Sequence, residues 1–448
     1  MSGVHPLPAE LAAGGFWRGV LRHPAFRRVW FGSMVSSIGT WMEGLGVQWL
    51  MAEQTGSTVM LGALAAAQLG PMLVLGLLGG LAADRFDRRN LLLVTQTTMM
   101  LIAVGLAVAA GLGQARPPVL LALGLANGIV MAFNTPAWQV LTPRLVPRDE
   151  LHRAIAMQGM QFNLARVVGP ALAGVLLAQT SAAVLFALNA CSFVAVLVAV
   201  AATAPAPPPP GPPAPVARQL GEAFAFVFTR PGPRALFAML LLLSALAAPL
   251  QRMLPLFVAD VFRAGEAGYG LLLGLFGAGA VLGGLTLGRW PRWYPRHHLI
   301  PLAMTLTGLC MTLFCTTSSL ALAGLWICAA GLVWIWAFSS TMTALQLLVG
   351  DSMRGRVMAV VNMAMFGAMP VGSILAAVLG ERLAGAWPGA AVQLGVGVMA
   401  AALAACGLVL LVFRTPEIDD LPPSSPRRRN LWLGLTAGEH RPRAPDAP

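Results

Sequence analysis

The chain has 448 residues, of which 57% are hydrophobic and only 10% are charged, and its mean hydropathy is +0.74. A soluble globular domain carries roughly 25% charged residues. This composition excludes a protein whose main solvent is water and indicates an integral membrane protein.

Twelve stretches are apolar enough and long enough to cross a membrane, which takes about 20 residues per helix. The first six predicted spans are 29–51, 60–83, 91–111, 118–140, 155–177 and 182–203. The other six are 235–257, 269–289, 299–317, 320–343, 357–380 and 389–413. We therefore predict an all-α membrane protein with twelve transmembrane helices in two six-helix halves, residues 29–203 and 234–413.

Three segments lie outside the two halves. Residues 1–28 contain no apolar run typical of a signal peptide, so we expect the first span to be retained. Residues 204–233 open with a proline-rich run that is typical of a linker and continue as an amphipathic segment, expected at the cytoplasmic surface. Residues 414–448 are expected to form a disordered cytoplasmic tail.

The positive charge of the loops predicts the orientation of the chain. The sequence has no lysine, and 24 of its 29 arginines lie in the terminal segments, the linker and alternate loops. Only Arg116, Arg263 and Arg382 lie in loops on the other side. Because positively charged loops stay in the cytoplasm during insertion, we expect both termini there. Attraction to anionic lipid accounts for the net charge of +12, and no nucleic-acid partner is expected.

The two predicted halves repeat one another. The segment 79–81 (GGL) and Arg85 at the end of the second span recur as 283–285 (GGL) and Arg289 at the end of the eighth, always 204 residues apart. Parallel repeats around a binding site at the middle of the membrane are typical of transporters.

Residues 80–89 (GLAADRFDRR) lie between the second and third predicted spans. This segment resembles motif A of the major facilitator superfamily in sequence and in position. A narrower resemblance, to the branch of enterobactin-type siderophore exporters and macrolide efflux proteins, rests on NTPA at 134–137, PRLVPRDEL at 143–151, RVVGPALAG at 166–174, YGLL at 269–272 and RGRV at 354–357. The resemblance covers residues 25–414 and implies the fold of that superfamily and a role in transport.

Motif A implies a gate. Adjacent glycines let two helices approach closely, and an aspartate can interact with the positive N-terminal end of a helix or with an arginine. Such a contact can hold one of two conformations. The alternative is that the arginines only fix the topology. The residues to which the resemblance gives this gating role are Gly80, Asp84, Arg85, Arg88 and Arg89.

Gly169, Pro170 and Gly174 resemble the core of motif C, a signature of drug–proton antiporters, although Ala173 replaces one of its glycines. A Gly-Pro step interrupts the hydrogen bonds of the fifth span and makes the helix bendable. A purely structural kink is the alternative.

Ionisable residues inside the spans are rare, because a charge at the membrane centre costs about 2.5–3.5 kcal/mol on insertion scales. The three candidates, Glu43, Arg166 and Arg252, are expected to couple protons to substrate. Glu43 shares a helical face with small and polar residues, so we expect it to face the bundle interior, to carry the proton and to pair with Arg252 when it is charged. The alternatives are a static hydrogen-bonding residue and a ligand for a substrate cation.

Four further residues are candidates for lining a substrate cavity: Trp41, Asn163, Trp334 and Trp336. For the tryptophans, helix packing is the alternative. The sequence shows no catalytic constellation, nucleotide-binding loop or metal-ligand cluster, and its five cysteines lie in spans, so neither enzymatic activity nor a cofactor, metal or disulfide is expected.

These observations favour a proton-coupled exporter of a small bulky or lipophilic molecule, either a siderophore or an antibiotic-like compound. The expected partners are the substrate, protons and membrane lipid, and the expected location is a bacterial inner membrane. A monomer is consistent with the sequence. Two alternatives stay open: an importer of a small metabolite, and a membrane sensor or assembly protein that does not transport.

Overall fold

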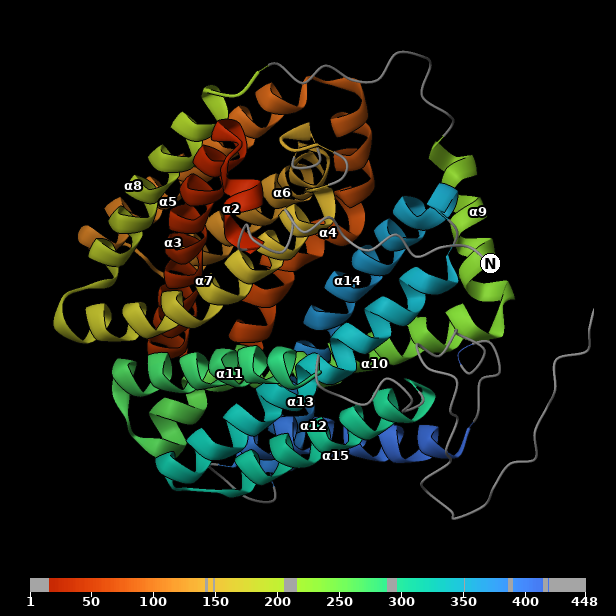
Figure 1. Cartoon of the computed structure of the whole chain (residues 1–448). Coiled ribbons are helices and arrows are strands. Elements are labelled where there is room, and N and C mark those ends of the chain that lie inside the picture. Colours follow the sequence, from red (N-terminus) through yellow and green to blue (C-terminus); the bar gives the residue numbers. More distant parts are fainter. Residues whose placement is uncertain are drawn as a thin grey trace, which may run out of the picture.

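The computed structural model describes residues 16–141, 144–147, 150–204, 216–287, 296–349, 351–385, 390–413 and 418. Within these residues the fold is helical and contains no strand (Figure 1). The first six long helices are α3 (Pro24–Thr55), α4 (Thr58–Arg85), α5 (Arg88–Gly111), α6 (Pro117–Leu141), α7 (Leu151–Gln179) and α8 (Ala182–Ala201). The next six are α10 (Pro231–Leu256), which continues as the π-helix η3 (Phe257–Phe262), α11 (Gly265–Leu287), α12 (Arg296–Thr316), α13 (Leu320–Leu348), α14 (Asp351–Ala384) and α15 (Ala391–Val412). Two short helices, α2 (Phe16–Leu21) and α9 (Val216–Thr229), precede the halves.

Each predicted span corresponds to one long helix, so the all-α prediction is confirmed. Eleven helices in the described part of the chain are long and apolar enough to cross a membrane. The helix outside that set is α3, which is long enough but less apolar, because glycine, serine and threonine residues and Glu43 lie in its middle. Large apolar side chains also cover the outside of the bundle, and Val74, for example, is 72% exposed. Such a surface suits lipid, and the chain is a multi-pass membrane protein.

Local signals explain where the helices begin and end. The Ser57 hydroxyl accepts a hydrogen bond from the Met60 amide at the start of α4, and the Asp87 carboxylate accepts one from the Asn90 amide at the start of α5. Gly56, which follows α3, has a φ of 55°, in the left-handed region that glycine favours. These turns let consecutive helices run antiparallel through the bundle.

Glycines bring the helices of each half into backbone contact. A Cβ built on Gly79 of α4 would collide with the Ala132 carbonyl of α6, and one on Gly283 of α11 would collide with the Leu332 carbonyl of α13. Small residues allow this close approach in membrane helices. The order of contacts repeats as well, because α4 packs on α6 and α5 on α8, as α11 packs on α13 and α12 on α15.

A second glycine contact shows how closely the halves repeat. Gly169 of α7 lies against Trp41 of α3, and Gly372 of α14 lies against Ala245 of α10. The two pairs are related by shifts of 203 and 204 residues along the chain. Inexact twofold symmetry in the sequence therefore corresponds to repeated packing in three dimensions.

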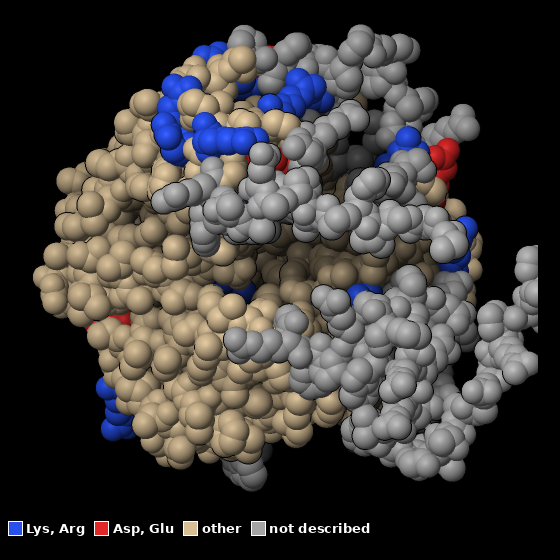
Figure 2. All heavy atoms as spheres, viewed as in Figure 1, with Lys and Arg blue, Asp and Glu red and all other residues tan. Residues whose placement is uncertain are grey.

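The two halves meet along two helix pairs, α7 with α11 and α4 with α14. In Figure 1 the first half, from red to yellow, lies above α11, α12, α13 and α15 of the second half, and α14, in blue, lies beside α4. Figure 2 shows a hollow between the halves. In the same view, arginine side chains, in blue, gather mainly over the upper part of the molecule. We refer to the end of the bundle that carries the α4–α5 turn and α9 as the arginine-rich end, and to the end that carries the α3–α4 and α7–α8 turns as the opposite end.

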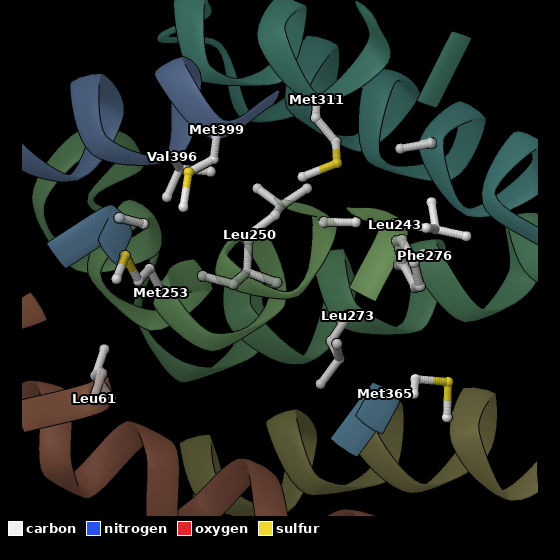
Figure 3. Close-up of a cluster of buried hydrophobic side chains, with 14 of the residues drawn as sticks. Leu61, Leu243, Leu250, Met253, Leu273, Phe276, Met311, Met365, Val396 and Met399 are labelled. Carbon is white, nitrogen blue, oxygen red and sulfur yellow. The ribbon is translucent and has the colours of Figure 1, made fainter. Parts of the chain in front are cut away.

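The core of the second half is rich in methionine. Leu250 and Met253 of α10 lie among Met311 of α12 and Met399 of α15 (Figure 3). Methionine fills irregular space with a flexible, polarisable side chain.

Two predicted segments lie largely outside the described residues. They are the proline-rich run, of which 205–215 are not described, and the tail, of which only 418 is described beyond 413. The second copy of the motif A arginine, Arg289, lies outside them as well.

Candidate functional site

Arg166 of α7 lies at the junction of the two halves, with only 6% of its surface exposed. Its guanidinium carbon is 4.8 Å from the ring centres of both Phe276 and Trp334, on α11 and α13, and 5.8 Å from that of Trp41 on α3. A cation over an aromatic face gains about 0.5–2 kcal/mol. One guanidinium N–H donates a long hydrogen bond of 3.5 Å to the Gln251 side chain of α10. We call these five residues the Arg166 cluster.

The backbone around Arg166 is also tightly packed. A Cβ on Gly277 of α11 would lie 3.2 Å from the Arg166 carbonyl and 2.9 Å from the Val167 side chain. A Cβ built on Gly169, one turn further along α7, would lie 2.6 Å from the Trp41 Cβ of α3. Glycine on both sides lets α7 carry the arginine between the two halves.

Arg252 of α10 forms a second cross-half contact. Its guanidinium donates a 3.1 Å hydrogen bond to the Gln68 side chain of α4 and lies near Tyr269 of α11. The ring of Tyr269 stacks on that of Trp49, with centres 6.0 Å apart. The Tyr269 hydroxyl is buried without a hydrogen-bond partner among the described residues. We call these four residues the Arg252 cluster.

Glu43 is buried in the bundle. In this conformation its partner is a residue other than Arg252, and pairing with Arg252 in another conformation stays a prediction. Its carboxylate accepts a 2.6 Å hydrogen bond from the Asn189 side-chain amide of α8. The face of α3 that carries Glu43 packs on α8, because Gly39 and Gly46 on that face admit α8 side chains. Within the described residues, Glu43 forms no ion pair with an arginine.

Two of the four cavity candidates join the site and two do not. Trp41 and Trp334 belong to the Arg166 cluster. The Trp336 ring N–H instead donates to the Gly283 carbonyl and the Thr286 hydroxyl, which joins α13 to α11. Asn163 donates to the Gly159 carbonyl of its own helix. These hydrogen bonds of Trp336 and Asn163 hold helices together or stay within one helix.

The described contacts of motif A join helices to one another in this conformation. Gly79, not Gly80, makes the close approach, because nothing lies within 4 Å of a Cβ built on Gly80. Arg88 is buried, and Arg89 donates a 2.6 Å hydrogen bond to the Ala201 carbonyl at the end of α8. Arg85 is exposed.

The Asp84 side chain lies outside the described residues, so its gating role stays a prediction.

Motif C lies on the contact between the halves. A Cβ on Gly174 would lie 2.7 Å from the Gly270 Cα of α11, and one on Gly270 would lie 2.8 Å from the Pro170 carbonyl. The two backbones therefore touch toward the opposite end of the bundle. Of the three motif residues, Pro170 and Gly174 lie at this contact, and Gly169 lies against α3.

Sequence reasoning missed several site residues. Gln68, Gln251 and Asn189 are uncharged polar residues inside spans, and a search for such residues would have found them. Phe276 gives no such signal, because it resembles any apolar core residue. Outside the membrane region, Glu150 was missed too, although it accepts hydrogen bonds from Arg22 and His23 at 2.8 and 2.7 Å.

A search of the described residues finds no group of three His, Cys, Asp or Glu side chains that could hold a metal ion. What the site does offer is cationic: two guanidinium groups between the halves, flanked by aromatic rings and neutral amides.

Comparison with known families decides the family. The model described as "Transmembrane secretion effector" matches residues 17–432. The chain belongs to this family of the major facilitator superfamily. The staphyloferrin A transporter of Staphylococcus aureus (strain NCTC 8325 / PS 47) is 25% identical over 351 residues, which are 78% of this chain and 88% of that protein. The enterobactin exporter EntS of Escherichia coli O1:K1 / APEC is 28% identical over 343 residues, 75% of this chain and 80% of that protein.

Solved structures of transporters have the same fold. A bacterial homologue of the human lysosomal transporter Spinster, in an inward-facing and unoccupied conformation, aligns with a TM-score of 0.67 at 14% identity, over 88% of this chain and 95% of that one. The nucleoside transporter NupG (D323A mutant) aligns with a TM-score of 0.68 at 13% identity, over 86% and 99%. The resemblance to the superfamily is therefore confirmed by sequence and by fold.

Proposed function

We propose that this membrane protein is a secondary active exporter of a siderophore-like small molecule. The observation that carries the proposal is the match, over at least three quarters of the chain, to transporters named for staphyloferrin A and enterobactin. The geometry supports it, because the two arginine clusters lie at the repeat interface, where transporters of this architecture bind substrate.

Transport proceeds by alternating access in this proposal. Glycine contacts close the halves toward the opposite end, and a hollow lies between them (Figure 2). Rocking of one half against the other would break the Gly174–Gly270 contact and close the arginine-rich end. The arginine distribution supports a cytoplasmic arginine-rich end and cytoplasmic termini in a bacterial inner membrane.

Protons are the proposed coupling ion, and Glu43 is the proposed carrier. It is the carboxylate nearest the middle of a long helix in the described chain, and it is 8% exposed. Protonation would weaken its charge-assisted hydrogen bond from Asn189 and so loosen α3 from α8. The coupling thus acts within the first half, at a contact separate from the two arginines.

Everted membrane vesicles test the function. Enterobactin and staphyloferrin A are supplied outside vesicles whose lumen is acidified by respiration. We expect faster uptake than in vesicles without the protein, and a protonophore should abolish the difference. Uptake that is insensitive to the protonophore would remove proton coupling, and accumulation by intact expressing cells would favour an importer. No transport of either compound or of a panel of lipophilic antibiotics would favour a sensor or assembly protein.

Glu43→Gln tests the carrier. A carrier requires loss of proton-driven transport while counterflow exchange of substrate persists. Full active transport by this variant would exclude the role, and loss of exchange would move Glu43 to the substrate site.

Labelling tests the orientation. Single cysteines at Arg89 and Arg296 should react with a membrane-impermeant reagent from the cytoplasm, and cysteines at Gln54 and Arg263 from outside. Labelling of Arg89 and Gln54 from the same side would refute the proposed topology.

A further inference from the structure

The two interior arginines have neutral partners. Arg166, on the first half, donates to Gln251 of the second half at 3.5 Å, and Arg252, on the second half, donates to Gln68 of the first at 3.1 Å. Each half thus supplies one arginine donor and one glutamine acceptor to the interface. Within the described residues, neither arginine forms an ion pair with a carboxylate.

A buried guanidinium without an anion is costly, because burial removes water that the amide oxygen of a glutamine only partly replaces. Arg166 has five N–H donors, of which one makes a single long hydrogen bond, and its Nε is buried without a partner. The aromatic rings of Phe276 and Trp334 occupy the region over its faces. A ligand therefore approaches along its N–H edges, the geometry in which arginine binds paired oxygens.

We propose that Arg166 and Arg252 form a two-point anion site, and that the transported molecule carries at least two anionic oxygen groups, such as carboxylates. This inference deepens the proposed transport function and depends on it for its physiological meaning. In the empty protein, Gln251 and Gln68 hold the guanidinium groups across the interface. The anionic groups of the substrate replace these amide oxygens.

The same exchange links binding to movement. Both glutamine bridges join one half to the other, so a ligand that takes over the arginines removes two contacts that hold this conformation. A ligand shifts a conformational equilibrium only by binding the two states differently. Displacement of the bridges supplies that difference, and a neutral molecule of the same size cannot displace them.

Binding of citrate to the purified full-length chain in detergent tests the site without transport. Citrate is the probe because it carries three carboxylates, and trimethyl citrate is its neutral counterpart. We expect citrate to bind in equilibrium dialysis at millimolar concentration or better, and trimethyl citrate to bind at least tenfold more weakly. Equal binding of the two probes, or no measurable citrate binding, overturns the proposal.

Variants locate the site. Arg166→Gln and Arg252→Gln should each raise the citrate Kd at least tenfold. Gln251→Glu keeps Arg166 and nearly the same shape but supplies a permanent carboxylate, so it should weaken citrate binding similarly without loss of folded protein. Gln179→Glu adds the same charge at an exposed position at the end of α7 and should leave the Kd unchanged. Citrate affinity unaffected by Gln251→Glu, or weakened equally by Gln179→Glu, contradicts the proposal.

The two proposals fail separately. Citrate binding with this variant pattern, but without export of any compound, would support the anion site and refute the exporter function. Export of enterobactin and staphyloferrin A that is unchanged in both arginine variants would leave the exporter and remove the anion site.

Discussion

Contacts inside each half differ in kind from contacts between the halves. Inside the halves, glycines place one helix backbone directly on another, as Gly79 does with Ala132 and Gly283 with Leu332. Between the halves, glycine contacts such as Gly174 with Gly270 and Gly277 with the Arg166 carbonyl are accompanied by two hydrogen bonds from arginines to neutral glutamines. The packing therefore favours two rigid halves and an interface whose contacts can break and form again.

The difference has an energetic basis. Close backbone packing gains dispersion energy from many atoms at once and has no equivalent alternative arrangement. An arginine–amide hydrogen bond contributes only about 1–3 kcal/mol, and a ligand can replace it. Substitutions at the two kinds of contact should thus affect different measurements.

The largest effect is expected inside a half. Gly79→Leu forces a side chain into the Ala132 carbonyl, and overpacking of this kind costs about 1–3 kcal/mol or more. We expect strong loss of folded protein from the membrane, measured by abundance and by the Tm of the purified chain. Gly80→Leu is the control, because the neighbouring glycine faces open space. Similar losses in both variants would contradict the packing described for α4 and α6.

The next effect is expected between the halves. Gly174→Val should separate α7 from α11 and shift the protein toward the conformation in which the opposite end is open. We expect near-normal abundance and a roughly tenfold or greater loss of transport, since a shift of 1.4 kcal/mol changes an equilibrium tenfold. Accessibility of a cysteine that replaces the buried Leu273 of α11 reports the shift. Abundance that falls as far as in Gly79→Leu would mean that this contact is also part of a rigid body.

A smaller, several-fold effect on transport is expected from Asp84→Asn. The substitution removes the charge and nearly keeps the shape, so it should weaken the gate predicted from motif A while membrane abundance stays near normal. Initial transport rates in vesicles, normalised to protein, measure this. Unchanged rates would assign Asp84 to the loop alone.

The smallest effects are expected at ion pairs outside the membrane core. Glu150→Gln should lower stability by about 1 kcal/mol, because the 5% exposed carboxylate has two partners, Arg22 and His23. Glu222→Gln is the matched control. It pairs with Arg356, and because both of these side chains are well exposed, about 0–0.5 kcal/mol is expected. Thermal unfolding of the two variants should rank them in this order.

The fold could be predicted from the sequence because its determinants are local. Span length, loop arginines and the repeated Gly-Gly-Leu each occupy a few consecutive residues, and α4 begins and ends within two residues of the predicted span 60–83. The bounds of the first helix were predicted less well, because α3 extends from Pro24 to Thr55 and carries charged residues at both ends, outside the predicted span 29–51.

The site could be predicted only in part, because its partners come from different helices. Periodicity correctly placed Glu43 in the interior, but it could not distinguish a face toward α8 from a face toward α10, so the contact with Asn189 in this structure was not predicted. Arg166 was found by its charge, whereas Phe276 became part of the site only through the packing of α11 on α7. Among the tryptophans, sequence spacing alone could not separate Trp334 from Trp336.

On the proposed binding mode, two interior guanidinium groups without ion-pair partners in the described chain would also make transport sensitive to voltage. An elementary charge that crosses the full membrane potential changes the free energy by about 2.3 kcal/mol per 100 mV. On the proposed binding mode, the loaded protein carries its substrate anions next to Arg166 and Arg252, and the field acts on a nearly neutral group. The empty protein returns with both charges uncompensated. The membrane potential would then affect the rate of the unloaded return step more than that of the export step. Collapse of the membrane potential would therefore change turnover even at a constant pH difference.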